Sequence, residues 1–119
     1  KIITVNQNIN YADKNYFLEG PEKFLSLVRN ASFVISNSFH AVAFSIIFQK
    51  DFVVFNRSYK INTRMRDLLR SIGQEPLLIL DETMLQQHQI KTIDFELIEK
   101  KLNVLITTSK KYLKTALNA

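Results

Sequence analysis

The chain has 119 residues, of which 46% are hydrophobic and 23% charged, a balance typical of one globular domain. It has no cysteine, and its two histidines, His40 and His88, lie far apart, which excludes disulfides and thiolate metal sites and argues against structural zinc. No apolar run approaches the ~20 residues of a membrane-spanning helix, so we predict a soluble, cytoplasmic protein without a transmembrane segment.

The positive charge, +5 in total, is unevenly distributed along the chain. Between Asn56 and Gly73 one acidic residue, Asp67, stands against five basic residues, which are Arg57, Lys60, Arg64, Arg66 and Arg70. Such a concentration favours a local anion-binding site over a broad nucleic-acid surface. We therefore predict an anionic small-molecule partner and no nucleic acid.

Strand and helix patterns alternate from the start of the chain. Residues 2–5 form a short β-branched run that predicts a strand, and the polar residues 6–15 predict a loop. Pro21 beside Glu22 is typical of a first helical turn, because proline lacks an N–H there and an acidic residue suits the helix dipole. Apolar residues then recur at helical spacing, which predicts a helix over residues 21–30.

The centre of the chain predicts two buried strands with an apolar helix between them. Residues 33–35 form a continuous apolar run, typical of a strand covered on both faces, and residues 52–55 form a second. Residues 40–48 contain Ser45 as the only polar residue after His40, and the polar residues on either side favour a buried helix.

The second half continues the alternation. The spacing of Met65, Leu68, Leu69 and Ile72 predicts a helix, with Gly73 as its C-cap. Residues 77–80 predict a short strand, and residues 94–117 predict one long or two abutting amphipathic helices.

This order of elements predicts parallel strands joined by right-handed crossovers. We therefore expect one α/β domain over residues 1–119, a Rossmann-like parallel sheet flanked by helices. The chain has only two glycines, so it carries neither a Gly-rich dinucleotide motif nor a P-loop.

Polar residues follow two of the predicted strands at the point where each strand ends. The first exit is the stretch from Ser36 to His40, and the second is residues 56–60, which lead to Asn62, Thr63 and Arg64. In a parallel sheet, ligands bind at the carboxyl ends of the strands, where helix N-termini present unpaired N–H groups. If the two strands are neighbours, these side chains converge on one anionic ligand.

Each of these residues also has a plain structural interpretation. Asn37 and Ser38 are good N-cap residues, and one residue can both cap a helix and contact a ligand. His40 can simply occupy a helix N-terminus, where the dipole disfavours a cation and keeps the imidazole neutral until an anion binds.

The arginines of the basic segment divide into two groups. Arg57 and Arg64 flank the predicted helix start, where contact with an anion is expected. Arg66 and Arg70 lie one turn apart and predict a solvated helix face. His88 lies in a run of glutamines and predicts an exposed loop residue.

Several motifs of the chain occur together in one known family. They are Gly20-Pro21-Glu22-Lys23-Phe24-Leu25, the block from Ala31 to Ser45 with Ser38-Phe39-His40 and Ala43-Phe44-Ser45, Phe52-Val53-Val54-Phe55, Asn62-Thr63-Arg64-Met65, and Ile93-Asp94-Phe95 near the last helix. The chain thereby resembles the C-terminal part of the polysaccharide pyruvyl transferase family. The resemblance spans nearly the whole chain.

Members of that family resemble two-domain glycosyltransferases of the GT-B kind. The resemblance therefore implies that the chain is the C-terminal, donor-binding half of a longer protein, with the missing N-terminal domain as its partner. The strand pattern that begins at Lys1 agrees with this expectation.

The family transfers the pyruvyl unit of phosphoenolpyruvate to sugar hydroxyls of a cell-surface polysaccharide, forming a pyruvate ketal. By this resemblance His40 is the catalytic candidate, as phosphate ligand or general acid. The substrate-binding candidates are Asn37, Ser38, Arg57, Asn62 and Arg64. We expect phosphoenolpyruvate as co-substrate, a sugar or polysaccharide as acceptor, and neither a cofactor nor a metal.

One position departs from the family pattern. Members commonly carry arginine two residues before the motif histidine, where this chain has Ser38. Either Arg57 or Arg64 holds the anion instead, or the donor differs. Two alternatives therefore stay open: a GT-B glycosyltransferase with a nucleotide-sugar donor, and a non-catalytic α/β module that binds an anion or a partner.

Overall fold

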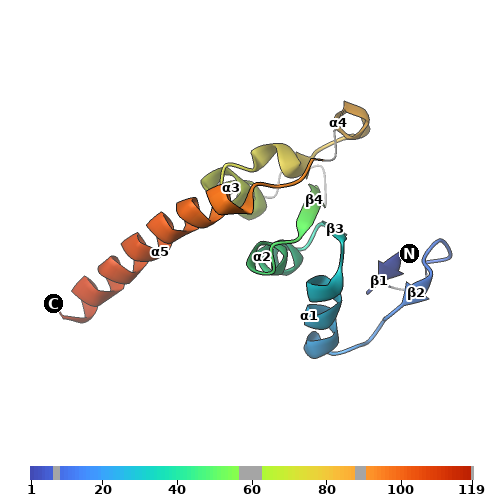
Figure 1. Ribbon diagram of the computed structural model, residues 1–119, viewed down its shortest axis with the longest axis horizontal. Coiled ribbons are helices and arrows are strands. Elements are labelled where there is room, and N and C mark those ends of the chain that lie inside the picture. The colour runs from blue at the N-terminus through green and yellow to red at the C-terminus, as the bar shows by residue number, and fades with distance from the viewer. Residues whose placement is uncertain (7–8, 57–62, 88–90, 119) are drawn as a thin grey trace.

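The main sheet of the molecule has three parallel strands in the order β3-β4-β5 (Figure 1). The computed structural model describes residues 1–6, 9–56, 63–87 and 91–118. The strands are β3 (Phe33–Ser36), β4 (Asp51–Phe55) and β5 (Leu78–Ile79). In the pairing register Phe33 lies opposite Asp51, and Val54 lies opposite Leu78. The predicted parallel α/β architecture is confirmed.

The helix before β3 and the two helices that lie between the strands along the chain follow the sequence patterns closely. They are α1 (Pro21–Asn30), α2 (Phe39–Ile47) and α3 (Thr63–Ser71). Pro21 opens α1 and Glu22 lies in its first turn, as predicted. Gly73 has a φ of +71°, a left-handed conformation that glycine adopts without strain, and it follows α3 as the predicted C-cap.

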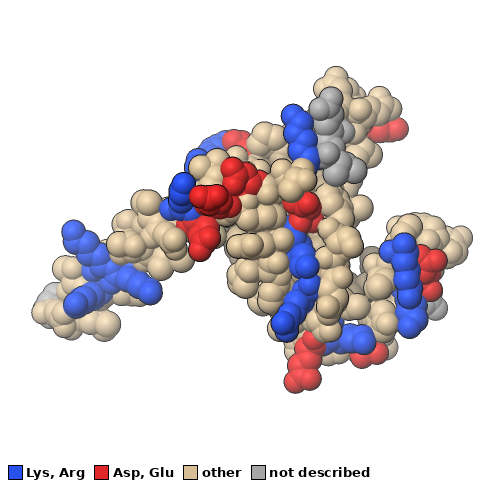
Figure 2. Space-filling model, viewed as in Figure 1, with Lys and Arg blue, Asp and Glu red and all other residues tan. Residues whose placement is uncertain are grey.

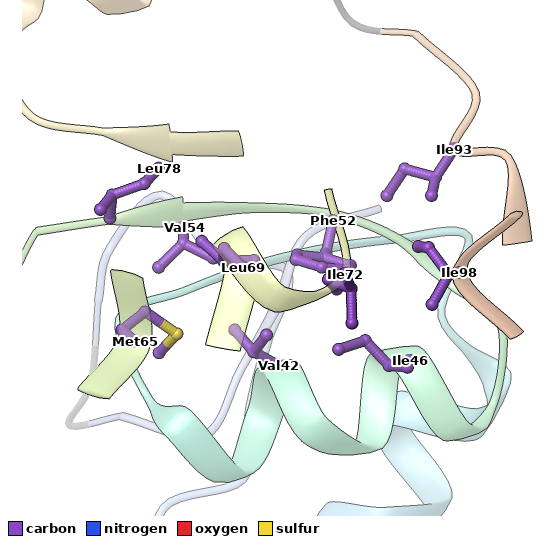
Figure 3. Close-up of a cluster of buried hydrophobic side chains, with 10 residues drawn as sticks. All are labelled: Val42, Ile46, Phe52, Val54, Met65, Leu69, Ile72, Leu78, Ile93 and Ile98. Carbon is purple, nitrogen blue, oxygen red and sulfur yellow. The ribbon is translucent and has the colours of Figure 1, made fainter. Parts of the chain in front are cut away.

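A compact apolar cluster fills the space between α2, α3 and the sheet (Figure 3). Leu69 of α3 and Ile72, the residue directly after α3, are fully buried, and they lie with Val42 of α2 against β4. The cluster consists of Val42, Ile46, Phe52, Val54, Met65, Leu69, Ile72, Leu78, Ile93 and Ile98. Because both helices pack on this cluster, it fixes where each of them begins relative to the strands.

The chain ends in one continuous helix, α5 (Phe95–Leu117), rather than two. The Asp94 side chain caps it by accepting a hydrogen bond from the Leu97 N–H at 3.1 Å. Ile98, near its start, is buried in the core, whereas the rest of α5 projects away from the body and leaves Leu113 and Leu117 exposed (Figure 1). Among the described helices none is long and apolar enough to span a membrane.

The outer part of α5 is a second region of positive charge. Lysines cover it in the space-filling view, and residues 100–118 include five of them with no acidic residue (Figure 2). The prediction placed the basic charge in one segment, between Asn56 and Gly73, and missed this second region. Lys110, Lys111 and Lys114 lie far along α5, well away from the sheet.

Two local predictions are wrong, and one helix was not predicted. Residues 6–15 are not only a loop, because β2 (Lys14–Asn15) pairs in parallel with β1 (Ile3–Thr4) in a separate two-stranded sheet. The 33–35 run is not covered on both faces, because β3 is an edge strand and Ile35 is 67% exposed. A short helix, α4 (Glu82–Gln87), was not expected, because its residues lack a buried apolar stripe.

The predicted strand at residues 77–80 is also shorter than expected. A 3₁₀ turn, η1 (Glu75–Leu77), takes up its beginning, because Pro76 favours a turn and supplies no N–H to a strand ladder. Only Leu78 and Ile79 pair with β4, opposite Val54 and Phe55. The predicted loop position of His88 lies outside the described residues.

Replacing Leu69 with alanine should lower the free energy of unfolding by about 2–5 kcal/mol, because it opens a cavity in the fully buried cluster. Leu113→Ala is the matched control, since Leu113 is 57% exposed and its loss should change stability by less than about 0.5 kcal/mol. Urea unfolding followed by circular dichroism gives both values. Equal effects of the two substitutions would contradict the placement of the core.

Candidate functional site

Two helices begin side by side at one edge of the main sheet. β3 and β4 are parallel neighbours in which Ser36 lies opposite Val54, so both strands end at the same edge. α2 begins at Phe39 after β3, and α3 begins at Thr63 after β4. The condition that the two strands are neighbours is therefore met, and two helix N-termini with their partial positive charge share this edge.

Serine hydroxyls organise the first turn of α2. Ser38 is the N-cap residue, and its Oγ accepts a hydrogen bond from the Ala41 N–H at 3.5 Å. Ser36 Oγ accepts from the Ser38 N–H at 3.0 Å. Both hydroxyls act here as acceptors, so each can still donate its own proton to an anion. The N–H groups of Phe39 and His40 precede the first possible intrahelical acceptor and point out of the helix start.

Asn37 and His40 are exposed at this edge and stand on either side of the capping serine. The imidazole of His40 lies perpendicular to the Phe39 ring, with 6.3 Å between the ring centroids. A ligand at the start of α2 can therefore reach an amide, an imidazole and two backbone N–H groups from solvent. These groups are all suited to hydrogen bonding with phosphate or carboxylate oxygens.

Arg64 joins this group from the other helix. It is the second residue of α3, and its guanidinium carbon lies 4.6 Å from the centroid of the Phe39 ring. A cation at this distance from an aromatic face is held by a cation–π interaction. The contact brings a permanent positive charge to the first turn of α2, as the convergence of the two strand exits predicts.

The described site consists of four predicted residues, Asn37, Ser38, His40 and Arg64, and of Phe39. Phe39 was not predicted, although its position between the cap and the histidine at the first helical residue was a usable signal. The other two candidates, Arg57 and Asn62, lie outside the described residues. Within the described part of the chain, no histidine, aspartate and glutamate side chains gather as metal ligands do.

The remaining arginines of α3 lie beside residues outside this site. Arg70 forms a two-point hydrogen-bonded pair with Glu75, with Nε to Oε2 at 3.2 Å and Nη2 to Oε1 at 2.9 Å. This exposed pair matches the solvated face predicted for Arg70. Arg66 does not match it, because its Nε is buried and has no hydrogen-bond partner among the described residues.

Arg66 also lines a hollow on the described surface. This hollow has a volume of about 370 Å³ and lies along β5, bounded by Arg66, Glu75, Pro76, Leu78, Leu80 and Met84. We call the candidate site at the start of α2, which consists of Asn37, Ser38, Phe39, His40 and Arg64, the α2 edge. The hollow has no residue in common with it. The Arg64 and Arg66 side chains therefore belong to two different surfaces, although they are two residues apart.

One family model matches the chain, and its description is polysaccharide pyruvyl transferase. The match covers residues 2–59, from β1 to just beyond β4, and includes Asn37, Ser38 and His40. Arg64 lies beyond the matched residues. Neither a curated protein nor a solved structure matches the chain.

Glu75 should titrate below its ordinary range. Its hydrogen bond with Arg70 lowers the pKa of the Glu75 carboxyl. The pair's contribution to stability is therefore present above the unfolded pKa of about 4.3 and is lost as the pH falls through the lower folded pKa. Carboxyl ¹³C titration should show this midpoint, and Arg70→Gln should raise it. An unchanged midpoint in Arg70→Gln would show that the pair does not form in solution.

Substitutions of Ser38 should separate capping from anion binding. Ser38→Ala should lower the free energy of unfolding by about 0.5–1 kcal/mol, because it removes the N-cap acceptor. Ser38→Asp should keep that stability, since aspartate caps equally well, but its negative charge should weaken the binding of inorganic phosphate. Urea unfolding and phosphate titration measure the two effects. Unchanged phosphate affinity in Ser38→Asp would remove Ser38 from the site.

Proposed function

Because a family model of polysaccharide pyruvyl transferases matches residues 2–59, we propose that the chain belongs to this family, binds phosphoenolpyruvate at the α2 edge and transfers its pyruvyl group to a polysaccharide. The product is a pyruvate ketal on two hydroxyls of one sugar. The two-domain GT-B arrangement, in which this chain supplies the donor-binding half, and a cytoplasmic location are parts of the same proposal.

The observation that carries the proposal is the contact between Arg64 and Phe39 at the start of α2. It gathers a guanidinium, the His40 imidazole and the first N–H groups of a helix at one exposed edge. Phosphoenolpyruvate carries a phosphate and a carboxylate on adjacent groups, and both need hydrogen-bond donors and positive charge. The edge offers donors of three chemical kinds over a small area.

The reaction needs proton transfer and an anion site, and the residues of this edge have the chemistry for both. One sugar hydroxyl adds to C2 of phosphoenolpyruvate and loses its proton, while a general acid protonates C3. A second hydroxyl then forms a bond to C2 and loses its proton, and the C–O bond to phosphate breaks, so that phosphate leaves with that proton and the ketal closes. A histidine is the usual side chain for such proton transfer near neutral pH.

His40 is proposed as the general acid or as a phosphate ligand. Its imidazole is exposed at the start of α2. An imidazole can donate a hydrogen bond to a phosphate oxygen or take part in proton transfer, so both roles fit this position.

Arg64 is proposed to supply the charge that a family arginine supplies at the position of Ser38. The Ser38 side chain is short, uncharged and already used as the helix cap. Arg64 reaches the same turn from α3, so the guanidinium comes from a different element. Arg57, Asn62 and Asn37 complete the proposed substrate-binding set.

The proposal predicts that phosphoenolpyruvate raises the melting temperature of the full-length protein and that this shift depends on His40 and Arg64. Arg64→Gln should weaken the affinity by roughly 10- to 100-fold, because it removes a charge-assisted contact. His40→Ala should lower turnover by about 10²-fold or more if His40 is the general acid. Arg29→Gln, which removes an exposed charge from the last turn of α1, is the matched control.

Ligand identity decides between the proposal and its alternatives. A larger rise in melting temperature with UDP or GDP than with phosphoenolpyruvate would favour a glycosyltransferase that uses a nucleotide-sugar donor. Salt-sensitive binding to unrelated polyanions, with no shift from either ligand, would favour a non-catalytic binding module. Full turnover in His40→Ala would refute the catalytic assignment.

A further inference from the structure

We propose that Phe39 is a positioning residue of the anion site, whose ring holds the Arg64 guanidinium over the first turn of α2. The inference rests on the proposed function only for the choice of ligand. Its geometric basis is the 4.6 Å distance between the guanidinium carbon of Arg64 and the centroid of the Phe39 ring. Phe39 would act through Arg64 and would not contact the reacting atoms.

Arg64 needs such a support because it is exposed and long. Its side chain has several rotatable bonds, and a free guanidinium on an exposed helix start samples many positions. Binding an anion would then require that this freedom be lost at the moment of binding, which weakens affinity. A contact that already restricts the guanidinium in the ligand-free protein removes part of that cost.

Phe39 is a suitable support because its own position is fixed. It is the first residue of α2, directly after the N-cap, and its side chain packs against the apolar cluster beneath the helix. It has only two side-chain torsions, and one end of the ring is held by the core. Its ring is therefore a rigid platform at the helix start, in contrast with the mobile side chain that lies on it.

The contact also leaves Arg64 free to act as a donor. A cation–π interaction uses the face of the aromatic ring and consumes none of the five N–H donors of the guanidinium. These donors stay available to the planar oxygens of a carboxylate or to a phosphate. An anion bound there would sit between the Arg64 guanidinium and the N–H groups at the start of α2.

The same ring touches the other functional side chain. The rings of Phe39 and His40 are perpendicular at 6.3 Å, so Phe39 borders both the cation and the imidazole. Among the described residues of this edge, Arg64 is the only permanently charged side chain. Its placement therefore determines where the negative charge of the ligand comes to lie relative to His40.

Phe39→Leu in the full-length protein tests the inference, because leucine keeps the apolar packing and removes the π face. We expect the affinity for phosphoenolpyruvate to fall roughly two- to fivefold, and the KM to rise more than kcat falls. Phe39→Trp should restore affinity, because indole is the best cation–π partner. Phe44→Leu is the matched control, since Phe44 is a half-buried ring of the same helix that contacts Phe24 and Phe48 instead.

A double-mutant cycle makes the test specific to Arg64. In an Arg64→Gln background, Phe39→Leu should cause no further loss of affinity, because the ring then has no cation to hold. Urea unfolding of each variant separates a loss of affinity from a loss of fold. The inference is overturned by an equal loss in both backgrounds, by an equal loss in Phe44→Leu, or by a failure of Phe39→Trp to restore affinity.

Repeating the cycle with inorganic phosphate separates this inference from the proposed function. Coupling between Phe39 and Arg64 with phosphate, in a protein that does not bind phosphoenolpyruvate, would support the positioning role and refute the proposed donor. Binding of phosphoenolpyruvate without coupling between Phe39 and Arg64 would support the proposed donor and refute the positioning role. Binding of neither anion would overturn both.

Discussion

The parallel pairing of β3 with β4 is the constraint on which the rest of the molecule depends. Four residue pairs, from Phe33 opposite Asp51 to Ser36 opposite Val54, set both strands to end at one edge. α2 follows β3 along the chain and α3 follows β4, and the contact between Arg64 and Phe39 shows that the N-termini of the two helices lie close together. A slip by one residue would turn Phe52 and Val54 away from the cluster between α2, α3 and the sheet and would separate Arg64 from Phe39. Core packing and the candidate site therefore depend on the same register.

At the candidate site, the position of one charged side chain matters more than the total charge of the chain. Most lysines of the chain lie on exposed surfaces, such as the outer part of α5, where water and salt screen them. At the α2 edge, one guanidinium lies beside two helix N-termini and an imidazole. These groups reinforce one another because all favour the same sign of ligand charge. The family match over residues 2–59 includes every residue of the candidate site except Arg64.

Elements whose ends or faces are marked by single residues or by short-range spacing could be predicted from the sequence. Pro21, Gly73 and the apolar spacing of α3 specified helix ends and faces without tertiary information. The failures depend on long-range contacts. Ile35 is exposed because β3 is an edge strand, which an apolar run does not reveal, and β2 exists only because Lys14 and Asn15 meet β1. The convergence of Asn37, Ser38, His40 and Arg64 was predictable from strand order, whereas the role of the Phe39 ring needed the structure. Arg57 and Asn62 remain predictions.

The central claim is that the start of α2 is the anion site, and a titration of ¹⁵N-labelled protein with phosphoenolpyruvate tests it most directly. The account predicts saturable shifts of the backbone amides of Phe39, His40 and Ala41 and of the Arg64 Nε–H, with little change along α5. Shifts that gather on Lys110, Lys111 and Lys114, or around the Arg66 hollow, would contradict it.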